Sequence, residues 1–116
     1  MGFPEPKEAD ILRDCLTWLR VKGAVVWRQN QGAISGEYKG KRRFIRFATA
    51  AGISDIIGLL PGGRFLAVEV KRPGKKPTAV QLQFLELIVQ SGGLACCVNS
   101  VAELETYLEL EGAFDA

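Results

Sequence analysis

The chain has 116 residues and 47% hydrophobic content, enough to build one core, and we expect a single domain that spans residues 1–116. It contains no histidine, which excludes zinc sites built on histidine, Ser-His and Cys-His nucleophile systems and a histidine general base. It also contains no run of about 18 apolar residues, so no membrane span is expected, and its net charge is only +2.

The small net charge hides an uneven distribution. Thirteen of the 15 lysine and arginine residues lie within residues 20–76, together with three acids, whereas residues 77–116 contain six acids and no basic residue. Such segregation predicts a basic face that binds a polyanion and an acidic face turned away from it. The alternative is a surface whose charges serve solubility alone.

The first ten residues, MGFPEPKEAD, lack the basic segment and apolar stretch of an export signal, so we expect a cytoplasmic protein that is not secreted. The cysteines agree with this expectation. They are odd in number, two are adjacent, and all three lie in apolar segments: Cys15, Cys96 and Cys97. The pattern predicts buried, reduced thiols.

A first helix is expected after Pro4 and Pro6 and runs to about Gly23. Its apolar arc recurs at helical spacing and is expected to face a core: Ile11, Leu12, Cys15, Leu16 and Leu19. Glu8 lies on the same arc, so its carboxylate is expected to point inward. The alternative is an acid that stabilises the helix dipole from the first turn.

Residues 24–27 are expected to form a short buried strand, and residues 32–40 a glycine-containing loop. Basic and aromatic residues alternate in residues 41–47, which favours an additional strand or ribbon. Phe44 and Phe47 are expected to anchor this ribbon rather than contact bases. Its basic residues would neutralise backbone phosphates: Lys39, Lys41, Arg42, Arg43 and Arg46.

Residues 54–71 consist of two apolar runs around a Pro-Gly-Gly turn, a pattern typical of a β-hairpin. With the turn centred near Gly62, Asp55 lies opposite Glu69, at a distance at which two carboxylates can bind one cation. Lys71 shares their face because strand side chains alternate. Oxygen ligands of this kind favour Mg²⁺ or Mn²⁺. The alternative is an ordinary hairpin with a Glu-Lys ion pair and a solvent-facing aspartate.

The mirror pairing also sets Leu59 opposite Phe65 and Ile57 opposite Ala67. A basic loop with Lys75 and Lys76 follows the hairpin and is expected to contact phosphates.

Thr78 begins a second helix with a capping box, in which Gln81 would accept from the Thr78 N–H. Gln81 also lies on the buried stripe of the helix, so it could instead orient a water or ligand near the metal, and both readings stay open. The helix ends at residues 91–93. Residues 94–98 are all apolar, which is typical of a central strand. The strand-helix-strand order predicts parallel pairing and a mixed sheet. Ser100 and Glu103 indicate a second capping box before a last helix that ends near Glu111.

Several of these residues together resemble the VRR-NUC family of the PD-(D/E)xK nuclease superfamily. The resemblance rests on Glu8 in a first helix, Gly-Ile-Ser-Asp at 52–55, Val-Glu-Val-Lys at 68–71, Thr-x-x-Gln at 78–81 and Gly-Gly at 92–93. Arg-x-Asn-x-Gly at 28–32 is similar to the family's second strand and turn. The match spans most of the chain. Ser54 departs from the pattern, because the family usually has a proline before the aspartate.

The resemblance implies an α/β fold with a restriction-endonuclease-like core, in which a mixed sheet is flanked by helices in the order αβββαβ, followed by a C-terminal helix. It implies a Mg²⁺- or Mn²⁺-dependent endodeoxyribonuclease. By analogy, the metal would be held by Asp55, Glu69 and the Val70 carbonyl, with Glu8 binding directly or through water. Lys71 would activate water or stabilise the transition state, and Gln81 would help in positioning.

Standalone members of the family resemble Holliday junction resolvases that act as homodimers. Branched DNA and a second copy of the chain are therefore the expected partners, and no nucleotide cofactor is expected. The residues expected to bind nucleic acid are Arg28, Asn30, Lys39, Lys41, Arg42, Arg43, Arg46, Lys75 and Lys76. The alternatives are a flap or single-strand nuclease, a nucleic-acid-binding module without catalysis, and a metal-stabilised interaction protein.

Overall fold

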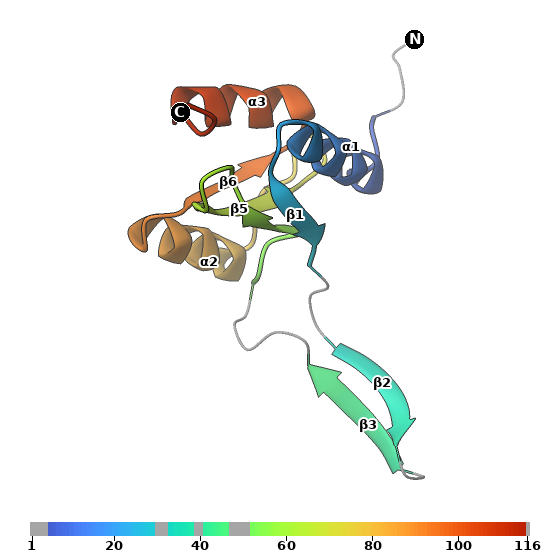
Figure 1. Ribbon diagram of the computed structural model, residues 1–116. Helices are drawn as coiled ribbons and strands as arrows, with labels where there is room; N and C mark the ends of the chain where they lie inside the picture. The colour runs from blue at the N-terminus through green and yellow to red at the C-terminus, as the bar shows by residue number, and fades with distance from the viewer. Residues whose placement is uncertain (1–4, 30–32, 39–40, 47–51, 116) are drawn as a thin grey trace.

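The computed structural model describes residues 5–29, 33–38, 41–46 and 52–115, which contain both helices and strands (Figure 1). In chain order the elements are α1 (Glu8–Val21), β1 (Val25–Arg28), β2 (Ala33–Tyr38), β3 (Lys41–Arg46), β4 (Ile56–Leu59), β5 (Phe65–Val70), α2 (Ala79–Gln90), β6 (Leu94–Val98) and α3 (Val101–Leu110). The expected α/β class is confirmed. Among the described residues, none of the helices is long and apolar enough to cross a membrane.

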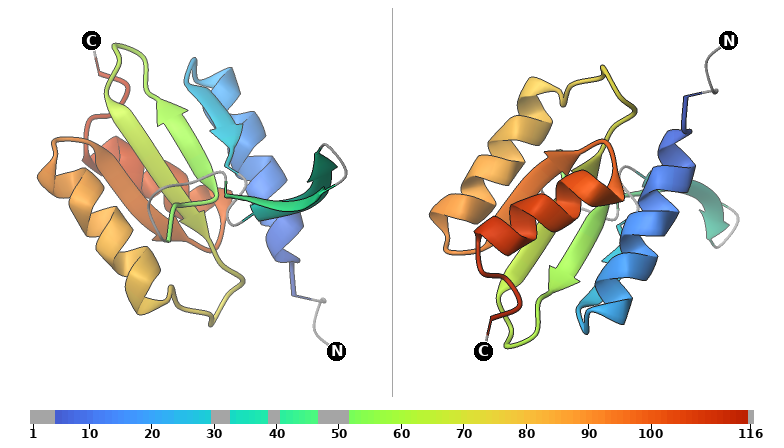
Figure 2. Two further views of the ribbon diagram at one scale, coloured as in Figure 1. Left: turned by 90° about the horizontal axis from the view of Figure 1, so that it is seen from below. Right: turned by 90° about the horizontal axis from the view of Figure 1, so that it is seen from above.

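Four strands form a mixed sheet in the order β1-β4-β5-β6. β4 pairs antiparallel with β1 and β5, whereas β5 and β6 are parallel. Helices α1 and α3 cover one face, and α2 packs on the other face against β5 and β6 (Figure 2). The expected core order αβββαβ and the C-terminal helix are thus confirmed, with β2 and β3 inserted between β1 and β4.

The hairpin of β4 and β5 has the predicted register, because Leu59 pairs with Phe65 and Ile57 with Ala67. Gly62 and Gly63 make the turn possible, since both have a φ of +96°, a conformation that residues with a Cβ rarely adopt. The Leu60 N–H donates to the Arg64 carbonyl at 2.8 Å and closes the turn.

The main core lies between the sheet and helices α1 and α3. The predicted stripe of α1 is buried there, together with Leu66, Val68 and Val70 of β5 and Leu104 and Leu108 of α3. A smaller cluster under α2 contains Ile57, Ala67, Leu85 and Ala95. The strands therefore bury side chains on both faces where helices cover them.

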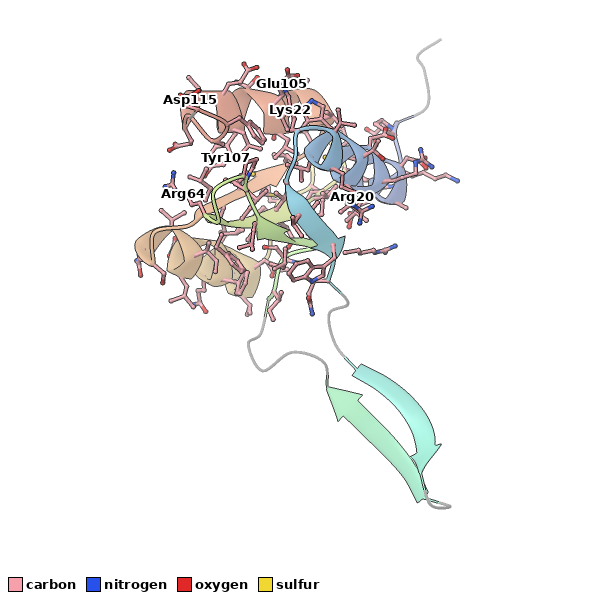
Figure 3. The ribbon with its side chains drawn as sticks, in the orientation of Figure 1. Arg20, Lys22, Arg64, Glu105, Tyr107 and Asp115 are labelled. Carbon is pink, nitrogen blue, oxygen red and sulfur yellow. The ribbon has the colours of Figure 1, made fainter. Side chains whose placement is uncertain are left out.

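β6 is an edge strand, although its apolar run predicted a central one. The prediction was wrong because apolar composition reports burial of both faces, and helices α2 and α3 provide that burial at the edge. Side chains occupy both outer edges of the sheet (Figure 3). Tyr107 Oη accepts from the Ala95 N–H at 3.2 Å, and Arg20 Nη2 donates to the Val26 carbonyl of β1 at 3.2 Å.

β2 and β3 form a separate two-stranded antiparallel sheet, with Ala33 paired to Arg46 and Tyr38 to Lys41. β3 was expected, but β2 replaces much of the loop predicted for residues 32–40. The residues Ser-Gly-Glu at 35–37 have low strand propensity, and pairing with β3 overrides it. Asn30, Lys39 and Phe47 lie outside the described residues, as do the side chains of Lys41, Arg42, Arg43, Phe44 and Arg46.

Two smaller expectations need correction. Ser100 caps α3 by accepting from the Glu103 N–H at 3.1 Å, but the Glu103 carboxylate accepts from Asn99 and not from Ser100, so the reciprocal capping box is incomplete. The three cysteines are free as expected, but only Cys15 is buried, and Cys96 and Cys97 are partly exposed. Both lie on the edge strand, which explains their exposure.

Candidate active site

The two acids predicted to share a cation lie together at one end of the sheet. The described ladder between β4 and β5 ends at Ile56 and Val68, one step before Asp55 and Glu69. Asp55 is held instead by its side chain, since its Oδ2 accepts from the Val70 N–H at 2.9 Å. Its carbonyl also accepts from the Gln29 N–H at 2.7 Å. Asp55 is thus tied to both β5 and the end of β1.

Glu69 is 2% exposed, and its two carboxylate oxygens have different surroundings. Oε1 accepts from Gln81 Nε2 at 3.1 Å and lies 3.8 Å from Lys71 Nζ. Oε2 has no hydrogen-bond partner among the described residues. The pKa of Glu69 is raised to about 8, first by burial and then by the negative charge of Asp55, whereas the positive charge of Lys71 lowers it.

Gln81 completes the predicted capping box, and its side chain also reaches the acidic site. Its Oε1 accepts from the Thr78 N–H at 2.8 Å, while the Thr78 hydroxyl accepts from the Gln81 N–H at 3.2 Å, which completes the capping box. Its Nε2 simultaneously donates to Glu69. The start of α2 is therefore connected to the acidic site by a single amide group.

Glu8 is exposed at the first residue of α1, whereas the apolar arc predicted a carboxylate turned inward. Its charge makes only the weakest of the contributions that raise the pKa of Glu69. In the described part of the chain, no three His, Cys, Asp or Glu side chains are grouped closely enough to hold a metal ion. The acids brought together are Asp55 and Glu69, and a ligand role for Glu8 stays a prediction.

Comparison with known structures identifies the fold. No known family profile and no curated protein sequence match the chain. A solved structure titled "VRR_NUC domain" aligns with a TM-score of 0.63 and 22% identity over 88% of this chain and 94% of that one. Another, titled "VRR_NUC domain protein", aligns with a TM-score of 0.55 and 17% identity over 92% of each chain. The chain has the VRR-NUC fold. The fold predicted from the motifs is confirmed.

The donor set at the acidic end of this VRR-NUC fold fits a hard divalent cation. An ionised carboxylate with a buried, unpartnered oxygen is costly in free energy, and a cation beside Glu69 Oε2 would offset that cost. The available donors are carboxylate and carbonyl oxygens, which Mg²⁺ and Mn²⁺ prefer. Asp55, Glu69 and the Val70 carbonyl are the groups that would hold such an ion.

Among the basic residues predicted to contact phosphates, three have described side chains. Lys75 and Lys76 are exposed in the loop between β5 and α2, which connects Glu69 to Gln81 along the chain. Arg28 is exposed at the end of β1. Because strand side chains alternate and its neighbour Trp27 pairs with Ile57 on the α2 face, Arg28 points to the opposite face of the sheet from the acids.

Sequence reasoning missed two neighbours of the site, Trp27 and Cys97, and did not predict the burial of Ser54. Ser54 is fully buried, and its hydroxyl has no partner among the described residues, at the position where VRR-NUC sequences usually have proline. Cys97 pairs directly with Glu69 across β5 and β6. Trp27 lies on β1, where it pairs with Ile57, and its Nε1 donates to Gln29 Oε1. Extending the hairpin register onto β1 and β6 would have located Trp27 and Cys97.

Proposed function

We propose that this chain is an endonuclease that hydrolyses DNA phosphodiester bonds with Mg²⁺ or Mn²⁺. The observation that carries the proposal is the unpartnered Oε2 of buried Glu69, next to the Asp55 carboxylate and Lys71. A site that only stabilised the hairpin would have no reason to bury a carboxylate with one oxygen unpaired, because such groups destabilise a fold. The likeness to VRR-NUC structures supports the same assignment.

A bound divalent ion lowers the pKa of a water molecule and polarises a phosphate, which supplies the hydrolytic chemistry without a histidine. The residues of the chain fix the geometry. Gln81 holds Glu69 Oε1, so that Oε2 is left for a cation, and the Val70 N–H holds Asp55. The Lys71 ammonium lies beside Glu69 with 17% of its side chain exposed, from where it would donate to an oxygen of the scissile phosphate.

The preferred substrate and assembly follow from the same resemblance. We propose that the enzyme acts on branched DNA, such as a four-way junction, as a homodimer. Resolving such a junction needs two symmetric cuts, and a dimer with two-fold symmetry presents two identical sites at a fixed separation.

The activity is tested with Mg²⁺ or Mn²⁺ and labelled four-way junction, flap, single-stranded and duplex DNA, with the mass of the protein measured by light scattering. Asp55→Ala and Glu69→Gln should abolish cleavage and keep the fold. Glu86→Gln serves as the matched control, because Glu86 is exposed on α2. Full activity in Asp55→Ala would overturn the site assignment.

Paired nicks by a dimer support the junction proposal, whereas a monomer that prefers flaps or single strands overturns only that part. Binding without any cutting would favour a binding module.

A further inference from the structure

The sheet face that carries the acids continues onto β1 as far as Trp27. The Gln29 N–H donates to the Asp55 carbonyl, and Trp27 pairs with Ile57, which is two residues from Asp55. Because side chains on a strand alternate, Trp27 lies on the same face as Glu69. Neighbouring positions on one face are about 7 Å apart along a strand. Trp27 therefore lies on the same face as the acids, one strand across from Asp55 and two residues along the sheet.

Among the described helices, none covers this part of the face, because α2 packs against β5 and β6 at the other end of the strand order from β1 (Figure 2). The Trp27 side chain is 46% exposed, although tryptophan is among the side chains that gain most from burial. Its Nε1 donates to Gln29 Oε1 at 3.1 Å, which restrains the orientation of the ring. An exposed, oriented aromatic ring next to a charged site is suited to stack on a ligand.

We propose that Trp27 stacks on an unpaired nucleotide next to the scissile phosphate, and that the substrate class is DNA with unpaired or unstacked nucleotides at the cut. This inference rests on the proposed nuclease function. Every base has a π face, so stacking on an aromatic ring does not depend on sequence. Inside a continuous duplex both faces of a base are covered by its neighbours. Trp27 therefore selects for DNA structure: single strands, flaps and branch points offer a free base face, and an uninterrupted duplex does not.

Neighbouring side chains on this face are suited to a different occupant, and the experiment must distinguish that occupant from a nucleotide. Val25, Leu59 and Phe65 form the next cross-strand row and are also exposed. A second copy of the chain packed on that row would also cover Trp27. The two occupants differ in their dependence on DNA and on protein concentration.

Tryptophan fluorescence makes this test direct, because the chain has only two tryptophans. Trp18 packs edge-to-face on Phe114 on the side of the sheet covered by α1 and α3, with ring centroids 5.8 Å apart. The variant Trp18→Phe leaves Trp27 as the only reporter. We expect a 20-nucleotide single strand, added with Ca²⁺ as a hard cation, to quench the Trp27 emission saturably. A perfectly paired duplex of the same sequence should quench it much less.

Cleavage kinetics provide an independent measurement. Trp27→Ala should raise KM for single-stranded or flap DNA by about tenfold or more, the loss expected for one stacked base, with a smaller effect on kcat. Trp27→Phe should restore most of the loss, because phenylalanine retains a π face. Val25→Ala is the matched control on the same strand and face, and its KM should be unchanged. An equal KM increase in Val25→Ala would overturn the stacking proposal.

The failures of the two proposals are distinguishable. Binding detected by the anisotropy of labelled DNA without a change in Trp27 emission would overturn the stacking role, whatever the cleavage activity. Saturable quenching without cleavage would leave the stacking role standing and overturn the nuclease proposal. A blue shift that grows with protein concentration in the absence of DNA would assign the face to a second copy and overturn the stacking proposal.

Discussion

Gln81 Nε2 lies 3.1 Å from Glu69 Oε1, while Oε1 of the same amide accepts from the Thr78 N–H at 2.8 Å. One side chain therefore determines both how α2 begins and how the buried carboxylate is oriented. The cap can be weakened without loss of the contact to Glu69, because the Thr78 hydroxyl takes part only in the cap.

Gln81→Ala should reduce the cleavage rate by about 10- to 100-fold, the usual effect of removing a group that orients a metal ligand. Thr78→Ala should destabilise the protein by about 1 kcal/mol through loss of the helix cap, with little effect on the cleavage rate. Urea unfolding and single-turnover cleavage measured on both variants separate the two effects. Equal rate losses in the two variants would show that Gln81 acts only through the cap.

The free energy of unfolding should depend on pH in a way that identifies Glu69. Its pKa is about 8 in the fold and 4.5 in a free peptide, so the native state binds more protons between these values. The stability of the metal-free protein should therefore fall as the pH rises from about 5 to 8. Glu69→Gln should remove this dependence and stabilise the metal-free protein at pH 8 by about 1–3 kcal/mol, since no buried charge remains. Thermal unfolding of the wild-type protein and Glu69→Gln at pH 5 and 8 measures this pH dependence, with Glu86→Gln as the control.

Divalent metal should restore the stability that the wild-type protein loses at pH 8. A ligand at 100 times its Kd stabilises the native state by about 2.7 kcal/mol. The rise in Tm on adding Mg²⁺ or Mn²⁺ should be larger at pH 8 than at pH 6, where protons compete for Glu69. The rise should be absent in Asp55→Ala. A metal-dependent increase in Tm that survives in this variant would place the cation elsewhere.

Lys71→Ala should reduce kcat strongly and leave the metal-dependent rise in Tm intact. Lys71 Nζ lies 3.8 Å from Glu69 Oε1, so its removal takes away a positive charge near the reacting phosphate but no oxygen ligand. Comparison of kcat with KM decides its role. A variant with normal kcat and a raised KM would make Lys71 a phosphate contact only.

Lys75 and Lys76 should contribute to binding without reading sequence. If both neutralise phosphates, changing each to alanine lowers the slope of log K against log salt by about 0.9 per contact for duplex DNA. Lys22→Ala is a suitable control, because Lys22 lies over the Trp18 and Phe114 rings, on the side of the sheet away from α2 (Figure 3). An unchanged slope in the Lys75 and Lys76 variants would move the binding surface to other residues.

The parts of the fold that sequence predicted well are those set by local patterns. The Pro-Gly-Gly turn and the alternation around it fix the register of β4 and β5, and this register brings Asp55 to Glu69. The stripe of α1 and the cap of α2 are local for the same reason.

The features that sequence did not predict depend on contacts between distant segments. β2 is a strand only because β3 pairs with it. β6 lies at an edge of the sheet, and its apolar composition does not show how many strands lie beside it. Glu8 shares the helical spacing of the core residues but is exposed, since it is the first residue of α1. Helical spacing alone does not show whether the sheet extends far enough to cover that residue.

β2 and β3 are inserted between two residues that lie side by side in the core domain. Gln29 precedes the inserted segment and Asp55 follows it, and the Gln29 N–H donates to the Asp55 carbonyl at 2.7 Å. The entropy of closing a loop depends only weakly on its length when its two ends are already neighbours. Relatives could therefore lengthen, shorten or replace this segment while the positions of Asp55, Glu69 and Lys71 stay the same. Selection can in this way change the DNA contacts proposed for the insertion independently of the proposed hydrolytic site.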